Sequence, residues 1–234
     1  MTTFIKNIPE DAFGPLIEEL TRDPIPVNHD RAQAGKGRSQ AFGVIRRWSY
    51  RPFLARNTWM RPHLYQMLLD FAECNLPPDF TWDGITVNDN YQSAMHRDKG
   101  NEAMSMTVSF GNFTGGELAI LDGRPGGGQR EYDTRHKLYS FHGCRDVHWT
   151  TPFEGRRFCL VFYKIVWPPK FPKYKITCHK EPDGLLIDDP YDNSIVVLDR
   201  KGHVVRIVRP PEPREWIGRL TSRGQPSRAN GFSA

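Results

Sequence analysis

Cysteine is scarce in this sequence, and apolar residues never form a long run. The four cysteines are Cys74, Cys144, Cys159 and Cys178. With no Cys-x-x-Cys pair, they exclude a finger-type zinc site and the disulfide scaffold of small secreted domains. No apolar stretch approaches the roughly 18 residues that span a bilayer, and residues 1–7 lack the apolar core of a secretion signal. We therefore expect an intracellular protein without a membrane segment.

Acidic residues are absent from one long segment. Between Arg31 and Leu69 there is no Asp or Glu, although the net charge of the whole chain is only +5. Basic residues interleaved with aromatic ones suit a surface that follows a phosphate backbone and stacks on bases. The alternative is a solvated basic face over ordinary core aromatics. The basic residues are Arg31, Lys36, Arg38, Arg46, Arg47, Arg51, Arg56 and Arg61, and the aromatic ones are Phe42, Trp48, Tyr50, Phe53 and Trp59.

The rest of the composition is that of an ordinary folded domain. The chain has 234 residues, of which 38% are hydrophobic and 25% are charged. Such a chain buries roughly 70 to 75% of the surface that it exposes when unfolded. A β-barrel or sandwich of this length can be a single domain. We therefore expect one catalytic domain with additions at its ends.

Short strands separated by glycine-rich turns occupy the middle of the chain. After an α-helical start, this pattern predicts a mainly β protein with supporting helices, an α+β chain built on a double-stranded β-helix or jelly roll. The breaks include Gly115-Gly116 and the segment 124–128. The predicted strands lie near residues 85–91, 103–110, 117–122, 137–142 and 157–165.

Two segments nearer the N-terminus have helical patterns. Residues 9–21 carry acidic side chains toward their start and a proline inside. Residues 60–75 repeat apolar residues at the three-four spacing of an amphipathic helix, with Pro62 near the start and two prolines beyond the end. We expect the second helix to support a sheet.

These patterns divide the chain into four regions. Residues 1–83 form an N-terminal helical and basic support region, and residues 84–166 form the double-stranded β-helix core. Residues 167–208 form a C-terminal extension, in which 194–198 and 203–208 flank a turn and predict a β-hairpin. Residues 209–234 are rich in Pro, Ser, Gly and Arg and are expected to be a flexible basic tail.

One stretch, residues 88–101, carries two candidate metal ligands. His96 and Asp98 stand two apart, so in an extended segment both side chains leave the same face and can reach one ion. A third ligand must come from elsewhere, and His148 is the candidate. Two imidazoles and one carboxylate on one side of a metal leave the opposite positions open, which suits non-haem Fe(II) that activates oxygen.

The combined motif resembles the Fe(II)/2-oxoglutarate-dependent oxygenases over residues 84–165, a little over a third of the chain. The resemblance implies that His96, Asp98 and His148 are the iron ligands and that 2-oxoglutarate and O2 are the cosubstrates. It rests on His-x-Asp at 96–98, on Phe113-Thr-Gly-Gly-Glu-Leu118, and on His148 followed by Pro152 and Arg157.

The resemblance also implies a basic anchor for the distal carboxylate of 2-oxoglutarate. Arg157 stands nine residues after His148 and matches the family position, and a guanidinium binds a carboxylate through two parallel hydrogen bonds. Its neighbour Arg156 is the alternative, although strand alternation places the two on opposite faces.

Polar residues on the strand that leads to His96 are further candidates to bind the cosubstrate. Asn90 comes first, followed by Asn88 and Tyr91, while a turn or sheet-edge role is the alternative for both asparagines. Ser109, on the next predicted strand, could reach the distal carboxylate.

Three functions fit the sequence. The local motif texture resembles the Tet/J-binding-protein-like group, which oxidises the methyl group of a pyrimidine base in nucleic acid. The basic region 31–61 and the C-terminal tail agree with a nucleic-acid partner. The second function is hydroxylation of a protein side chain or small molecule on the same fold, since the fold does not fix the substrate. The third is a non-catalytic nucleic-acid-binding protein.

Overall fold

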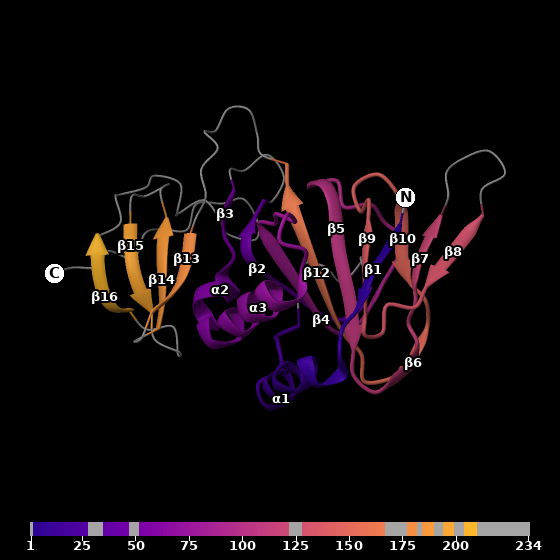
Figure 1. The fold of residues 1–234 in the computed structure, drawn as a ribbon, viewed down its shortest axis with the longest axis horizontal. Helices are drawn as coiled ribbons and strands as arrows, with labels where there is room; N and C mark the ends of the chain where they lie inside the picture. The colour runs from indigo at the N-terminus through magenta and orange to yellow at the C-terminus, as the bar shows by residue number, and fades with distance from the viewer. Residues whose placement is uncertain are drawn as a thin grey trace. The chain divides into compact units, whose positions relative to one another are not determined.

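The computed structural model describes residues 2–27, 35–46, 52–121, 128–166, 177–181, 184–189, 194–198 and 204–209. The chain divides into two compact units. The first, Met1–Lys173 with Arg200–Gly202, contains the helices and strands β1 to β12 (Figure 1). The second contains an antiparallel sheet in the order β13-β14-β15-β16 (Thr177–Glu181, Gly184–Asp189, Ser194–Leu198 and Val204–Arg209).

A seven-stranded sheet forms the centre of the first unit. Its order is β1-β9-β5-β12-β4-β2-β3, and every neighbouring pair is antiparallel. Strand β12 lies between β4 and β5, so it is hydrogen-bonded on both edges. The strands are β1 Thr3–Asn7, β2 Gly35–Ile45, β3 Phe53–Leu54, β4 Gly84–Ser93, β5 Asn101–Phe110, β9 Lys137–Phe141 and β12 Phe158–Ile165.

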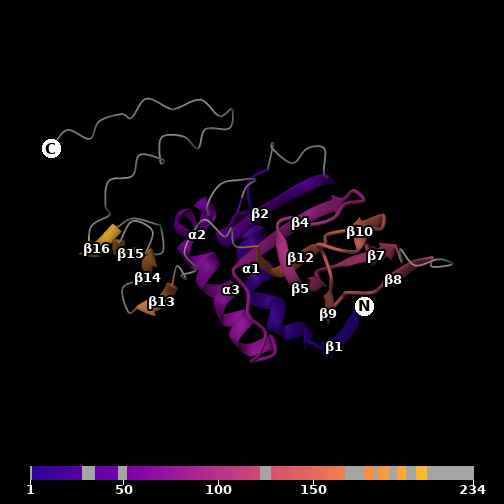
Figure 2. The ribbon, with the colours of Figure 1, turned by 90° about the horizontal axis from the view of Figure 1, so that it is seen from above.

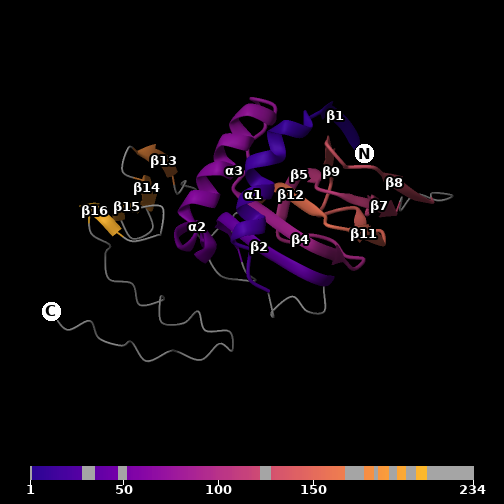
Figure 3. The ribbon, with the colours of Figure 1, turned by 90° about the horizontal axis from the view of Figure 1, so that it is seen from below.

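Smaller sheets pack on one face of the large sheet. A three-stranded sheet has the order β10-β7-β8 (Val147–Thr150, Leu118–Leu121 and Gln129–Tyr132), and β11 (Phe153–Gly155) pairs with β6 (Phe113–Gly115). Figures 2 and 3 show the three-stranded sheet on the side of the large sheet away from the helices. Leu118 and Ile120 of β7 pack against Phe141 of β9, which joins the two layers.

Helices cover the opposite face of the large sheet. They are the 3-10 helix η1 (Glu10–Phe13), α1 (Gly14–Arg22), α2 (Arg56–Met60) and α3 (Pro62–Asn75) (Figure 2). Phe13 is fully buried and stacks on Phe110 of β5, with ring centroids 4.7 Å apart. Its ring also makes a tilted contact with Phe71 of α3, at 5.3 Å between centroids. Within the described residues, no helix is long and apolar enough to cross a membrane.

Strand β12 divides its side chains between these two sides. Phe158 and Phe162 make ring contacts with Phe110 and Phe71 on the helical side. The alternate residues Cys159 and Val161 therefore face the smaller sheets, and Val161 packs on the Leu118–Phe141 cluster. The inner face around them is largely polar, with Ser39, Thr86, Asn88, Thr107 and Ser109 in register across the neighbouring strands.

The predicted fold class is confirmed: two facing antiparallel layers with helical support form a double-stranded β-helix. All five predicted core strands and both predicted helices are present, and β15 pairs with β16 as the predicted hairpin. The large sheet also takes β1, β2 and β3 from residues 1–83, where the sequence predicts helices and a basic surface. The predicted tail lies outside the described residues from position 210 onward.

The buried ring of Phe13 provides a test of this packing. Replacing Phe13 with Ala should lower the free energy of unfolding by about 3 to 5 kcal/mol, because the change leaves a cavity between helices and sheet. Phe4→Ala is the control, since that ring is 47% exposed. Urea denaturation of both variants checks the difference, and equal losses would contradict the described packing.

Candidate metal centre

His96 and His148 are held side by side by their own backbones. His96 follows β4, whereas His148 lies in β10 of the smaller sheet. The His96 N–H donates to the His148 carbonyl at 3.0 Å, and the His148 N–H donates to the His96 carbonyl at 2.9 Å. This antiparallel bridge brings the two imidazole centroids to 4.3 Å. Ser93, at the end of β4, adds a 3.0 Å hydroxyl hydrogen bond to Thr150.

Each imidazole has a backbone partner that directs its other nitrogen toward the site. His96 Nδ1 lies 2.7 Å from the Ala94 carbonyl, and His148 Nδ1 lies 3.0 Å from the Asp146 carbonyl. A carbonyl only accepts, so Nδ1 carries a proton in both rings, and Nε2 is the atom that can bind an ion once it is deprotonated. Metal-bound histidines are commonly oriented in this way.

Asp98 supplies the carboxylate between the two rings. Its Oδ1 lies 3.4 Å from His96 Nε2, and its Oδ2 lies 3.6 Å from His148 Nε2. Burial acts to raise the pKa of this carboxyl, but hydrogen bonds and charge interactions with His148 and His96 outweigh it and hold the pKa well below its usual range. Asp98 is thus ionised at neutral pH, as a metal ligand must be.

The three ligand atoms match one face of an octahedral site. They all lie within 4.8 Å of one another. Two ligands at right angles around a metal, each about 2.1 Å away, stand about 3 Å apart, close to the distances from Asp98 to both rings. The described part of the chain adds no fourth His, Cys, Asp or Glu to this group. The residues therefore fit a ferrous ion with open positions opposite the protein.

Gly143 makes room for the Asp98 carboxylate. It lies in the turn between β9 and β10, and its carbonyl accepts the Asp98 N–H at 2.8 Å. A Cβ atom at position 143 would lie 2.9 Å from Asp98 Oδ2, closer than such atoms approach in proteins. Gly143 thus has both a backbone contact and a steric reason to be glycine.

Arg157 brings a buried positive charge into the barrel. It lies directly before β12 and is 4% exposed. Its guanidinium lies over the rings of Phe113 and Phe153, at 5.5 and 5.6 Å. Its buried Nε has no hydrogen-bond partner, and among the described residues no carboxylate pairs with it. A buried cation without a counter-charge is costly, so Arg157 is arranged to receive an anion.

Arg156, the alternative anchor, belongs to the other side of the sheet. Its guanidinium lies 5.0 Å from the Phe158 ring centroid and 3.4 Å from Asp89 Oδ2. The side chain is 40% exposed. Arg156 therefore already has a carboxylate partner, which favours Arg157 as the anchor.

The other predicted cosubstrate residues have varied surroundings. Asn88 faces the interior, and its buried Oδ1 has no partner. Asn90 is exposed, and its Oδ1 accepts the Arg157 N–H at 2.8 Å. Ser109 is buried with its hydroxyl 2.8 Å from that of Thr134, and Tyr91 is 7% exposed. Asn88 is thus available to a ligand, whereas the side chains of Asn90 and Ser109 already have protein partners. Direct binding by these residues stays a prediction.

The structure adds residues that the sequence does not identify. Ser39 of β2 and Ser105 of β5 are buried, and neither hydroxyl has a partner. Ser39 is in register with Asn88, so two unsatisfied polar groups lie side by side on the inner face. Phe113 belongs to the recognised Phe-Thr-Gly-Gly motif, which was the only sequence signal for its role. Nothing in the sequence marks Ser39, because β2 has no regular alternation of apolar residues.

In its described part, the acid-free segment forms contacts that hold the fold together. Arg38 donates to the Ile25 carbonyl at 3.0 Å, and Arg61 donates to the Asp23 carboxylate at 2.7 Å. Lys36 and Arg56 are exposed. Arg31, Arg47 and Arg51 lie outside the described residues, as do the tail arginines at 214, 219, 223 and 228.

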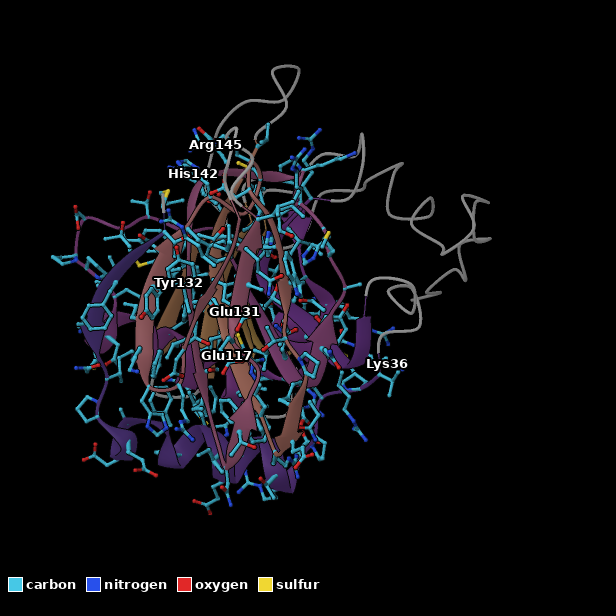
Figure 4. All side chains as sticks on the ribbon, turned by 90° about the vertical axis from the view of Figure 1, so that its right-hand side faces the viewer. Lys36, Glu117, Glu131, Tyr132, His142 and Arg145 are labelled. Atoms are coloured by element: carbon cyan, nitrogen blue, oxygen red, sulfur yellow. The ribbon has the colours of Figure 1, made fainter. Side chains whose placement is uncertain are left out.

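Exposed basic and apolar residues lie next to the candidate metal ligands in the chain. Met95 is 60% exposed, and Arg97 and Lys99, which alternate with the ligands His96 and Asp98, are also exposed. Arg145 extends from the turn that carries Gly143, with 67% of its side chain exposed and a 3.6 Å contact to Asp146. Figure 4 shows His142 and Arg145 at one end of the barrel, away from Glu117, Glu131 and Tyr132 on its side.

Comparison with known proteins gives similarity in structure only. No family model and no curated protein matches the sequence. Among solved structures, NgTET1 in complex with 5mC DNA is 13% identical, with a TM-score of 0.48 over 70% of this chain and 72% of that one. Similarity at this level leaves the activity and the substrate of this chain open.

Two further structures are similar to a comparable degree. An oxidoreductase of the 2OG-Fe(II) oxygenase family from Burkholderia pseudomallei is 17% identical, with a TM-score of 0.45 over 69% of this chain and 82% of that one. A Pseudomonas putida prolyl-4-hydroxylase is 13% identical, with a TM-score of 0.46 over 70% of this chain and 92% of that one.

The space beside Asp98 makes Gly143 a sensitive position. Gly143→Ala should weaken Fe(II) binding by about 10-fold or more, because the new methyl group displaces the carboxylate. Gly100→Ala is the control, since a Cβ there meets nothing within 4 Å. Anaerobic titration of Fe(II) into both variants measures the effect. Unchanged affinity in Gly143→Ala would show that the carboxylate does not bind the ion in the described position.

Proposed function

We propose that the protein is an Fe(II)- and 2-oxoglutarate-dependent dioxygenase that hydroxylates a C–H bond. The observation that supports this most strongly is the pairing of an open three-ligand site with a buried, unpaired arginine in the same barrel. His96, Asp98 and His148 offer three ligand atoms on one side of a metal. Arg157 offers a guanidinium that lacks a carboxylate among the described residues. A 2-oxo dicarboxylate has one chemical group for each.

Each residue has a defined task in this proposal. His96 and His148 bind the ion through Nε2, because their Nδ1 protons are held by backbone carbonyls. Asp98 contributes one negative charge, so the ferrous site keeps a net charge of about +1 and attracts an anionic ligand. Arg157 binds the distal carboxylate and fixes the orientation of the oxo acid. When bound, iron, 2-oxoglutarate and oxygen supply the oxidation, with succinate as coproduct.

The inner face of the sheet also favours a polar cosubstrate. Ser39 and Asn88 are in register across β2 and β4, and each has a buried oxygen without a partner. Buried polar atoms normally have hydrogen-bond partners, so these two fit a ligand or water that completes them. We propose Asn88 as a cosubstrate contact, with Tyr91 and Ser109 as weaker candidates. Asn90 would act through Arg157, whose backbone N–H its side chain already accepts.

For the substrate, we propose nucleic acid, with a methylpyrimidine base as the oxidised group. The support is the exposure of four residues that neighbour the candidate ligands or Gly143 in the chain, Met95, Arg97, Lys99 and Arg145. Exposed cations favour a phosphate backbone, and Met95 offers apolar contact to a base. Hydroxylation of a protein side chain or small molecule is the alternative, and a non-catalytic nucleic-acid-binding protein is the third. The similar structures include a complex with DNA and a prolyl hydroxylase, so they favour neither substrate.

Loss of an iron ligand should abolish turnover. His96→Ala and Asp98→Ala should form no succinate from 2-oxoglutarate in the presence of Fe(II), oxygen and substrate, because two remaining ligands do not hold the ion in place. Asp79→Asn, an exposed carboxylate, is the control. Undiminished succinate formation in either ligand variant would refute the metal assignment.

Salt dependence distinguishes the substrate classes. Replacing Arg97, Lys99 and Arg145 with Ser should weaken binding to DNA or RNA and reduce the slope of log affinity against log salt by about 1 for each cation that contacts phosphate. Lys6→Ser, on β1, is the control. Incubation with Fe(II), 2-oxoglutarate, and methylated or unmodified DNA and RNA, followed by mass analysis of the nucleosides, identifies the product. No affinity at low salt and no altered nucleoside would exclude nucleic acid as the substrate.

A further inference from the structure

Arg157 is held from three directions before any ligand binds. Its backbone N–H donates to Asn90 Oδ1 at 2.8 Å, and its carbonyl accepts the Asn90 N–H at 2.8 Å. Asn90 adopts a φ of 49°, a left-handed conformation that asparagine tolerates better than most residues. The strand therefore bends at Asn90 so that its side chain and backbone both bind Arg157.

Two aromatic rings hold the guanidinium at the other end of the side chain. The guanidinium carbon lies 5.5 Å from the ring centroid of Phe113 and 5.6 Å from that of Phe153, within the range of cation–π attraction. The two rings come from β6 and β11, which pair so that Phe113 is opposite Gly155 and Phe153 is opposite Gly115. Arg135 further fixes Phe113 by donating to its carbonyl at 3.0 Å.

The stem of Arg157 fits against a residue without a side chain. A Cβ atom on Gly116 would lie 2.8 Å from both Cδ and Nε of Arg157. Gly116 also has a φ of 74°, in the region that favours glycine. Any larger residue at position 116 would push the arginine out of its place between the rings.

We infer that Asn90, Phe113, Gly116 and Phe153 are positioning residues that set Arg157 in its ligand-binding conformation, so that the protein selects a 2-oxo dicarboxylate over a 2-oxo monocarboxylate. A free arginine side chain loses rotamer entropy when a ligand orders it. The four positioning residues remove much of that loss before binding, and pre-organisation of this kind raises affinity. This inference rests on the proposed function, because it requires the distal carboxylate to bind Arg157.

The test measures binding rather than turnover. Fe(II)-loaded protein without oxygen is titrated by calorimetry with 2-oxoglutarate and with 2-oxobutyrate, which has the same 2-oxo acid head but no distal carboxylate. Phe153→Leu removes a partly exposed ring, and Asn90→Gly removes the acceptor while keeping the left-handed backbone available. Each variant should bind 2-oxoglutarate about 5- to 30-fold more weakly, with unchanged affinity for 2-oxobutyrate and Fe(II).

Phe153→Tyr keeps an aromatic ring, so it should bind 2-oxoglutarate as tightly as the wild type, in contrast to Phe153→Leu. Phe4→Leu should also behave as wild type. Unchanged 2-oxoglutarate affinity in both Phe153→Leu and Asn90→Gly would overturn the inference. So would an equal loss for both oxo acids, since that pattern indicates general damage to the barrel. If the wild-type protein binds Fe(II) but neither oxo acid, the proposed function itself fails, and the variants are not needed to see it.

Discussion

The site depends on one pair of reciprocal backbone hydrogen bonds, between His96 and His148. These residues are far apart in the sequence and belong to different layers of the barrel. The bonds fix their separation without any help from a metal, and the Ser93–Thr150 hydrogen bond strengthens the same junction. Asp98 then needs only to follow two residues after His96, with Gly143 leaving space for its carboxylate. The loop after β4, paired with β10, thus sets the positions of all three candidate ligands.

Two groups of opposite charge, the Asp98 carboxylate and the Arg157 guanidinium, determine which ligands the barrel favours. The Asp98 carboxyl stays ionised despite burial because both imidazoles stabilise it. The three-residue site therefore favours a cation. Just before β12, the buried guanidinium of Arg157 favours an anion instead. The proposed 2-oxo dicarboxylate offers a metal-binding 2-oxo acid to the first group and a carboxylate to the second. The polar inner face of the large sheet, with Ser39 and Asn88 unsatisfied, is consistent with such an occupant.

The sequence predicts those features that depend on local periodicity or fixed spacing. Alternation along 157–165 predicts β12 and separates Arg157 from Arg156. The offsets among His96, Asp98 and His148 predict a group of three candidate ligands, which the structure brings together. Strand β2 could not be predicted, because its first half is glycine and polar residues whose pairing with β4 supplies the strand structure. The hydrogen bond between Asn90 and Arg157 could not be predicted either, since it depends on the left-handed backbone of Asn90 and on a partner far along the chain. Contacts of this kind arise from tertiary pairing rather than from the residue type.

A crystal structure of the protein grown without oxygen in the presence of Fe(II) and 2-oxoglutarate tests the central claim most directly. The account predicts one iron bound by His96 Nε2, Asp98 and His148 Nε2, with the 2-oxo acid filling two further positions and its distal carboxylate paired with Arg157. Iron bound elsewhere, a fourth protein ligand that closes the site, or a distal carboxylate that leaves Arg157 unpaired would contradict it.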